Sequence, residues 1–547
     1  MKKILSISTI LAMSTIAGAE TLYYNGVNDD SLWGLATTWI DSDGNPASAA
    51  PSDSSDLIVD FDRVNADMRT VYGAIRTTAI NNLTVNSLTW QNIKTLTLHD
   101  KSSGAETKSS QFRLAMGTWQ STDRPVNFTI LNDFKASAAA GSNVSNIFGA
   151  CELNTPSTMP KIVIGGNFQL GDVATKDVAG TYYKLDIGNN GCQTVGGYTG
   201  PQYFEVGKNV NLIGATSLTF NVGNDSVAPT LETPSVMIKG VVNFEGGTSG
   251  NPIFVLNSRN IGSGTGNPSG VKNNPVFFVG GFNGNVGQIS NFTRSSAIGY
   301  LGGLSTVVLK TADNADYTYW GSIYDDDTTD AQGQRAQIKF ISDGNGIQRL
   351  SGKNAFSGGI TMLSGTLLVG SNYASEQNHG DLTIRGGKFG NSRTTARTWS
   401  ATNLVIGSNN GINGTIDIYV NSSSDFDKIA FSGAAIKDES FVDGMSKLII
   451  DFSGNASTLI GGGEFKIFSF ESTSDSAGFQ SSDFISSTII EKDGLNYTAQ
   501  FRFDDGKTLV SDAGLYATFV QVVPEPATIS AILGAFAFAI AVYRKLK

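Results

Sequence analysis

Short β-rich runs recur along this chain, and they are bounded by Gly, Asn and Asp. No segment of helical length shows a convincing 3.6-residue amphipathic period. Representative runs lie at 83–90, 94–98, 161–164, 217–222 and 446–452. Because the side chains of a strand alternate between its two faces, each run predicts a strand that buries one face. The pattern therefore predicts an all-β protein.

The composition agrees with this prediction and excludes several kinds of chemistry. Of the 48 acidic residues only 12 are Glu, and Asp favours turns where Glu favours helix interiors. The hydrophobic share of 40% excludes a disordered chain. A net charge of −10 without a clustered basic surface argues against nucleic acid as a partner. Two Cys and two His exclude a His/Cys metal cluster, and we expect neither metal nor cofactor.

A glycine-containing motif recurs at Ile164, Val206, Ile238 and Val279, at intervals of 42, 32 and 41 residues. These intervals suit one or two coils of a solenoid with about 20 residues in each coil. Glycine would occupy the corners, and Asn would stack along the axis. The spacing therefore predicts a parallel β-helix whose neighbouring coils cover each other's apolar faces.

The clearest single repeat lies within 317–370. It holds Leu-Ser-Gly-Lys-Asn at 350–354, Phe356, Ser-Gly-Gly at 357–359 and Gly-Thr-Leu-Leu-Val-Gly at 365–370. This order resembles the autotransporter-associated β-strand repeat. The resemblance implies a right-handed β-helix on an exported surface protein.

The N-terminus has the pattern of a secretory signal. Lys2 and Lys3 precede an apolar stretch at 4–16, and Ala17 and Ala19 flank Gly18 as small residues that a signal peptidase accepts. We therefore predict a signal helix over 1–19 that signal peptidase removes. Its loss would leave a mature net charge of about −12, because two lysines and no acids are lost.

The C-terminus combines three features. A Pro-Glu-Pro motif precedes an apolar run at 527–543, and basic residues close the chain. The residues concerned are Pro524, Glu525, Pro526, Arg544, Lys545 and Lys547. Together they resemble the PEP-CTERM sorting signal of Gram-negative bacteria. The resemblance implies that an exosortase recognises the tail, cleaves near the motif and passes the protein to the cell surface or extracellular matrix. A permanent tail anchor in the membrane is the alternative, since the run is marginal for a span.

The chain after the signal peptide divides into four predicted parts. Residues 20–75 form an N-terminal cap sealed by Trp33 and Trp39, with a sugar-binding Trp platform as the alternative. Residues 76–430 form the β-helix. Residues 431–520 form a β meander that closes the solenoid, and 521–547 form the sorting tail.

Few residues are candidates for chemistry. Asp325, Asp326 and Asp327, with Asp330 nearby, could bind Ca²⁺ or act in glycoside hydrolysis, but adjacent acids in a turn are usually a solvated loop. His99 and His379 are expected at the surface, because neither has a Cys or His neighbour.

Cys151 and Cys192 could form a disulfide after export. With coils of the predicted length they would lie two rungs apart, near 10 Å, which exceeds the 7 Å limit, so the bond is left open.

These observations predict an exported structural or adhesive protein rather than an enzyme. Its C-terminal helix would anchor it transiently in the inner membrane before it reaches the cell surface, the outer envelope or the extracellular space. Its partners beyond the processing enzymes would be surface polysaccharide or other copies of itself. Shallow contacts with sugars would come from aromatic residues such as Trp119, Tyr198 and Trp399. The alternative is a secreted carbohydrate-active β-helix enzyme, a polysaccharide lyase or hydrolase.

Overall fold

The computed structural model describes most of the chain between residues 20 and 523 and divides it into two compact units, residues 1–275 and 276–547. The described residues are 20–25, 33–63, 70–71, 74–80, 83–99, 106–109, 112–116, 127–151, 161–188, 203–222, 230, 234–258, 274–291, 303–325, 335–370, 378–409, 411, 413–471, 478–506 and 513–523. The predicted signal peptide and sorting motif therefore lie outside the described residues.

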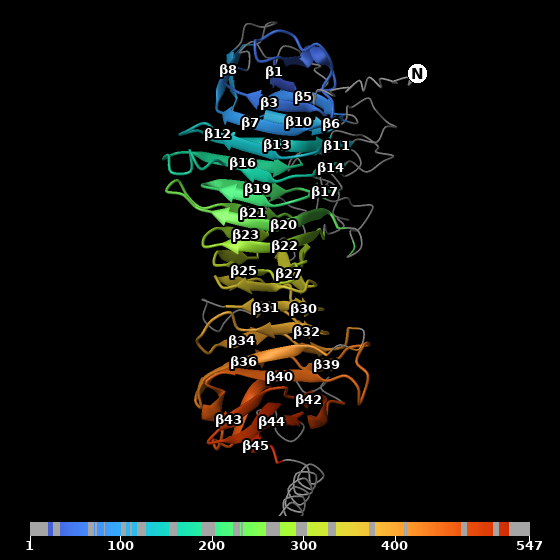
Figure 1. Ribbon diagram of the computed structural model, residues 1–547, viewed down its shortest axis with the longest axis vertical. Helices are drawn as coiled ribbons and strands as arrows, with labels where there is room; N and C mark the ends of the chain where they lie inside the picture. The colour runs from blue at the N-terminus through green and yellow to red at the C-terminus, as the bar shows by residue number, and fades with distance from the viewer. Residues whose placement is uncertain are drawn as a thin grey trace, which may run out of the picture. The chain divides into compact units, whose positions relative to one another are not determined.

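The described chain is nearly all β, with parallel strands in long sheets, which confirms the predicted all-β, solenoid-like fold (Figure 1). Its helical elements are three short 3₁₀ turns, η1 (Ala36–Thr38), η2 (Ala456–Leu459) and η3 (Ser481–Asp483). No helix in the described ranges is long and apolar enough to cross a membrane.

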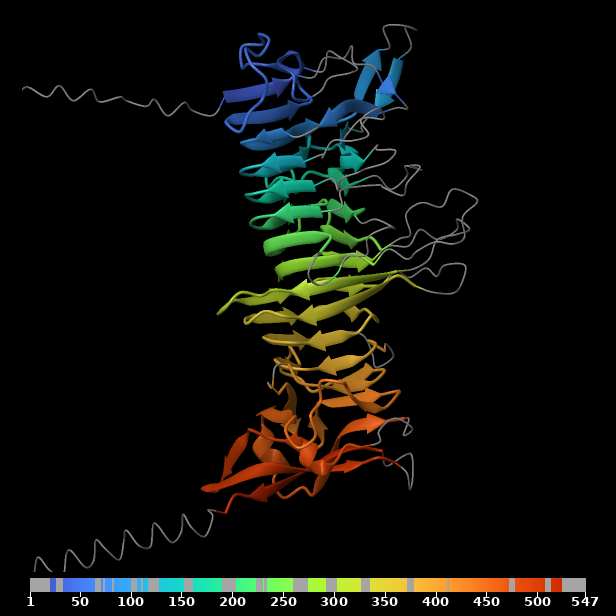
Figure 2. The same ribbon diagram turned by 90° about the vertical axis from the view of Figure 1, so that its right-hand side faces the viewer.

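The first unit stacks strands in two sheets, and most neighbouring strands pair in parallel (Figure 2). The strands of the first sheet are β1 (Glu20–Tyr24), β2 (Trp39–Ile40), β3 (Ser55–Asp60), β6 (Leu83–Val85), β7 (Ser87–Ile93), β11 (Asn127–Ile130), β12 (Phe134–Ala138), β14 (Lys161–Ile164), β15 (Phe168–Leu170), β17 (Tyr203–Val206), β18 (Val210–Ile213) and β20 (Val236–Glu245). Those of the second are β4 (Thr70–Val71), β5 (Ala74–Ile80), β10 (Phe112–Met116), β13 (Asn143–Cys151), β16 (Tyr182–Ile187), β19 (Thr216–Phe220) and β21 (Ile253–Leu256). A separate antiparallel hairpin joins β8 (Leu96–His99) to β9 (Glu106–Ser109).

The second unit has the same parallel stacking and ends in antiparallel strands. Its long sheet contains β22 (Val276–Gly284), β24 (Leu304–Leu309), β25 (Asp316–Tyr319), β27 (Gln337–Ser342), β28 (Ile347–Leu350), β30 (Ile360–Met362), β31 (Thr366–Val369), β32 (Leu382–Ile384), β33 (Lys388–Gly390), β35 (Leu404–Ile406), β36 (Thr415–Ser422), β37 (Asp425–Phe426), β39 (Ala435–Lys437), β40 (Leu448–Gly454) and β42 (Phe484–Ile485). Three further strands are β23 (Gln288–Asn291), β26 (Ser322–Tyr324) and β29 (Asn354–Ala355). A six-stranded sheet contains β34 (Thr398–Ala401), β38 (Lys428–Phe431), β41 (Glu464–Phe470), β43 (Ile489–Lys492), β44 (Leu495–Asp504) and β45 (Gly514–Gln521).

The strand register corrects the predicted coil length. Ile164 pairs with Val206, and Val206 pairs with Ile238, so each of these two motif intervals is one coil and not two. Coils of the expected length occur within the second unit, where Ile360 pairs with Leu382 and Leu382 pairs with Leu404. The predicted coil length is thus correct for this stretch and wrong for the first unit. The additional residues of the longer coils lie between paired strands.

Aromatic rings and amide ladders hold the first unit together. Trp33 and Trp39 are fully buried and pack edge to face with ring centroids 5.1 Å apart. Since neither indole exposes a ring face, the alternative of a Trp platform for sugars is wrong at these two residues. The amide of Asn243 donates to Asn211 of the preceding coil at 2.9 Å, which confirms the predicted stacking of Asn along the coils.

Candidate functional site

The buried carboxylate of Asp325 connects β27 with the segment that follows β29 in the second unit. One carboxylate oxygen accepts the Ile338 N–H at 2.8 Å, and the other accepts the N–H and the hydroxyl of Ser357 at 2.8 and 2.5 Å. Burial raises the pKa of this carboxyl to about 6, although these donors favour its charged form. The prediction of a solvated loop is therefore wrong at Asp325. Asp326, Asp327 and Asp330 lie outside the described residues.

A small half-open cavity of about 30 Å³ lies farther along the second unit, between β33, β34, β36 and β38. Its apolar wall consists of Val369, Phe389, Trp399, Ile416, Ile418 and Ile429. Its polar side chains are Asn391, Arg397, Asp417, Asp427 and Lys428. Strand alternation explains the arrangement in β36, because Ile416 and Ile418 point to the core while Asp417 between them points outward.

Asp427 is the most buried acid of this cavity, with 7% exposure. One carboxylate oxygen accepts the Arg397 N–H at 2.7 Å and the Asn391 amide at 3.0 Å, and the other accepts the Tyr419 N–H at 2.9 Å. Burial, together with a smaller contribution from the negative charge of Asp417, raises the pKa of Asp427 to about 6. The carboxyl, which lies between β37 and β38, thus connects the loop before β34 with strand β36.

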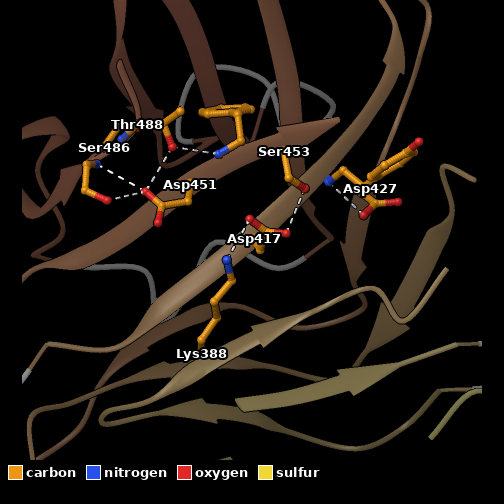
Figure 3. A network of polar contacts seen from close by, with 10 residues as sticks. Lys388, Asp417, Asp427, Asp451, Ser453, Ser486 and Thr488 are labelled. Atoms are coloured by element: carbon orange, nitrogen blue, oxygen red, sulfur yellow. Dashed lines mark hydrogen bonds and ion pairs between the residues drawn. The ribbon is translucent and has the colours of Figure 1, made fainter. Parts of the chain in front are cut away.

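Asp417 belongs to a second polar network, which Figure 3 shows from close by. Its carboxylate accepts from Lys388 Nζ at 3.1 Å and from the Ser453 hydroxyl at 2.8 Å, so it joins three successive strands, β33, β36 and β40. Asp451 in β40 likewise accepts a hydrogen bond from outside its own strand, from the Thr488 hydroxyl at 3.1 Å. The charge of Asp417 is therefore compensated within the protein.

Trp399 and His379 form a buried stack beside the cavity. Their rings lie 4.8 Å apart and 4° from parallel, and their side chains are 8% and 3% exposed. His379 Nδ1 lies 3.0 Å from the carbonyl oxygen of Phe356, and burial lowers the pKa of this imidazole to about 4. The predictions of a surface position for His379 and of a sugar contact at Trp399 are both wrong. Trp119 and Tyr198 lie outside the described residues.

The remaining predicted site residues are only partly covered. Ala17, Ala19, the Pro524–Pro526 motif and the terminal cations lie outside the described residues, as does Cys192. Cys151 ends β13, where Phe148 pairs with Ile187 of the next coil. The pairing of Phe148 with Ile187 shows one coil of about 39 residues at this level of the stack, longer than the coil length predicted from the sequence. Because Cys192 lies outside the described residues, the disulfide stays a prediction.

Sequence reasoning missed Asp417 and Asp427. The alternation Ile416-Asp417-Ile418 could have predicted a strand with Asp417 on its outward face. Nothing local marks Asp427, because its partners are 8, 30 and 36 residues away. No group of three or more His, Cys, Asp and Glu residues in the described chain is arranged to hold a metal ion.

Comparison with known proteins adds no assignment. No protein-family model matches the chain, and no curated protein matches it.

Proposed function

We propose that this protein is an exported, non-enzymatic structural or adhesive protein, built as a right-handed parallel β-helix and displayed at the cell surface or in extracellular matrix. Signal peptidase would remove residues 1–19, and an exosortase would recognise Pro524-Glu525-Pro526. The inner membrane would hold the C-terminal helix until cleavage. Surface polysaccharide or another copy of the chain would be the partner.

One observation supports this proposal most strongly: buried or half-buried carboxylates of the described chain accept hydrogen bonds from neighbouring strands and loops. Asp325, Asp417 and Asp427 each accept two or three hydrogen bonds from other strands or loops. A buried carboxylate engaged in this way fixes the position of its coil, because separating the strands would leave its donors unsatisfied. Such a network favours a rigid scaffold.

The cavity favours one alternative, a carbohydrate-active enzyme with Asp427 as general acid and Asp417 as its charged neighbour. A raised pKa beside an ionised carboxylate is the pattern of many glycosidases. Against this reading, both oxygens of Asp427 already accept hydrogen bonds, and Asp417 is paired with Lys388 and Ser453. A general acid must be within reach of the glycosidic oxygen, and these contacts occupy the positions it would use.

Processing is tested in the host that exports the protein. We expect the wild-type protein to be released without Arg544, Lys545 and Lys547, which an intact mass reports. The Glu525→Gln variant should stay in the membrane fraction, whereas Glu491→Gln, an exposed acid in β43, should be released normally. Release of the Glu525→Gln variant with the same mass as the wild type would refute exosortase processing.

The functional class is tested by incubating the purified protein with acidic and neutral polysaccharides, and by measuring bound protein and new chain ends together. We expect binding without new chain ends. Cleavage that is lost in Asp427→Asn would replace the proposal with the enzyme reading.

A further inference from the structure

We propose that the hairpin of β43 and β44, together with the end of β45, is a membrane-contact face that docks on the headgroup layer of a phospholipid bilayer (Figure 1). The inference rests on the proposed function, because it concerns the stage at which the tail at 527–543 would still be inserted. It gives that stage a second contact, made by folded residues of the second unit.

The hairpin and the end of β45 carry four exposed apolar side chains. Ile489, Leu495, Val522 and Val523 are 64%, 41%, 40% and 67% exposed. Ile490, next to Ile489 in β43, is only 9% exposed and belongs to the core. Exposed apolar residues that occur singly need no explanation, whereas a group of them at one end of a sheet indicates a contact surface.

The strand register brings two of these side chains together. β44 and β45 are antiparallel, and the Val522 N–H donates to the Asn496 carbonyl oxygen at 2.7 Å. Continuing this register by one residue sets Val523 opposite Leu495, and cross-strand neighbours lie about 5 Å apart.

The turn of the hairpin is well defined. Lys492 pairs with Leu495, and the two residues between them, Asp493 and Gly494, have φ of 55° and 76°. Positive φ at both central residues is the geometry of the two-residue turns that match the twist of paired strands. The apolar side chains of the hairpin are therefore held on an ordered element.

The length of chain before the apolar run identifies the occupant. Val523 is the last residue that the structure describes, and the apolar run begins at residue 527, four residues later. Because an extended chain spans at most about 3.6 Å per residue, Val523 would lie within about 14 Å of the inserted segment. The headgroup layer is itself about 5–7 Å thick on each side of the hydrocarbon core. An inserted tail would thus hold the exposed side chains at this layer, where burial of apolar surface is favourable.

The charges of the hairpin set the depth of the contact and the kind of lipid. Glu491 and Asp493 flank Lys492, whose ammonium donates to the Ile460 carbonyl oxygen at 3.0 Å. Ionised carboxylates are strongly disfavoured in hydrocarbon, so the contact stays in the headgroup layer. Two acids and one cation suit a zwitterionic headgroup better than an anionic one.

The test reconstitutes the full chain in phosphatidylcholine vesicles, with the fluorescent residue introduced as Leu495→dansylalanine. A nitroxide attached near the headgroup of the lipid quenches a fluorophore only at close range. The matched control is Asn314→dansylalanine, at an exposed residue of the same unit. Five strand pairings of about 4.8 Å each separate β25, which follows Asn314, from β40. We expect the nitroxide lipid to quench position 495 at least threefold more than position 314.

A double variant separates the apolar contact from the tether. Ile489→Asn/Val523→Asn in the labelled chain should lower the quenching at position 495 at least twofold, while the protein still floats with the vesicles. Both side chains are more than 60% exposed, so the fold should tolerate the change. Val173→Asn, at a 57% exposed valine of the first unit, should leave the quenching unchanged.

Flotation reports the tail and quenching reports the hairpin, so the two failures are distinguishable. A chain that floats with equal quenching at both positions, or with unchanged quenching in the double variant, would overturn the inference and leave the anchored tail intact. Shielding of position 495 from aqueous iodide without quenching by the nitroxide lipid would assign this face to the tail or to a second copy, and would also overturn it. A chain that does not float would refute the anchored stage of the proposed function.

Discussion

Lowering the pH should destabilise the second unit through His379. Its imidazole is 3% exposed and stacked on Trp399, and burial lowers its pKa from 6.5 to about 4. Because the folded-state pKa lies below the unfolded value, the stability contributed by the neutral ring is complete above pH 6.5 and is lost as the pH falls towards 4. A shift of about 2.5 pKa units corresponds to about 3 kcal/mol at pH 4.

The perturbation is the His379→Gln substitution, which removes the titrating group. Denaturant unfolding of wild type and variant should be compared at pH 7.5 and at pH 4. The raised pKa values of Asp325 and Asp427 make the folded protein more stable as the pH falls, which opposes the effect of His379. The pH dependence of the wild type alone therefore does not isolate the contribution of His379, whereas the difference between wild type and variant does. We expect acidification to cost the wild type about 3 kcal/mol more than the variant.

Direct titration gives the stricter measurement. The chain has two histidines, so NMR of labelled imidazoles yields two curves, and the one missing in His379→Gln belongs to His379. A midpoint near 6.5 for that curve, together with equal acid sensitivity of the two proteins, would refute the reasoning.

Three further predictions concern the buried carboxylates and the close contact of two coils. Asp325→Ala leaves the buried N–H groups of Ile338 and Ser357 without an acceptor, so the free energy of unfolding in denaturant should fall by about 2–4 kcal/mol. In the control Asp443→Ala, where the side chain is 82% exposed, it should fall by less than about 0.5 kcal/mol. The free energy of unfolding of the wild type should fall as the pH rises from 4 to 6, because the raised folded-state pKa of Asp427 makes its ionisation in the folded protein unfavourable by about 3 kcal/mol. Asp427→Asn should reduce this fall. An unchanged dependence of the unfolding free energy on pH in the variant would contradict the role of Asp427. Gly352→Ala would drive a methyl group into the Gly321 carbonyl oxygen and should lower the melting temperature by several degrees, unlike Gly34→Ala, where nothing lies within 4 Å.

The fold class was predictable because strand alternation and glycine-bounded turns are local signals. The runs at 83–90 and 161–164 form β6, β7 and β14, and alternate residues within β6 and β14 are buried. Coil length was predictable only around the recognisable repeat. Where Ile164 pairs with Val206, the residues between them include segments whose length no strand pattern encodes, so one long coil looks like two short ones.

The candidate site could not be predicted, because its chemistry depends on contacts between different coils. Asp427 acquires its raised pKa from burial and from Asp417, and its three donors come from 8 to 36 residues away. His379 shows the same limit: its neighbours Asn378 and Gly380 indicate an exposed turn, yet the ring is buried between Trp399 and Phe356. A turn residue of a solenoid is covered when the adjacent coil extends over it, and that depends on the length of the neighbouring coils. Surface chemistry in such a fold must therefore be derived from the stacking of the coils, and only afterwards from the residue types.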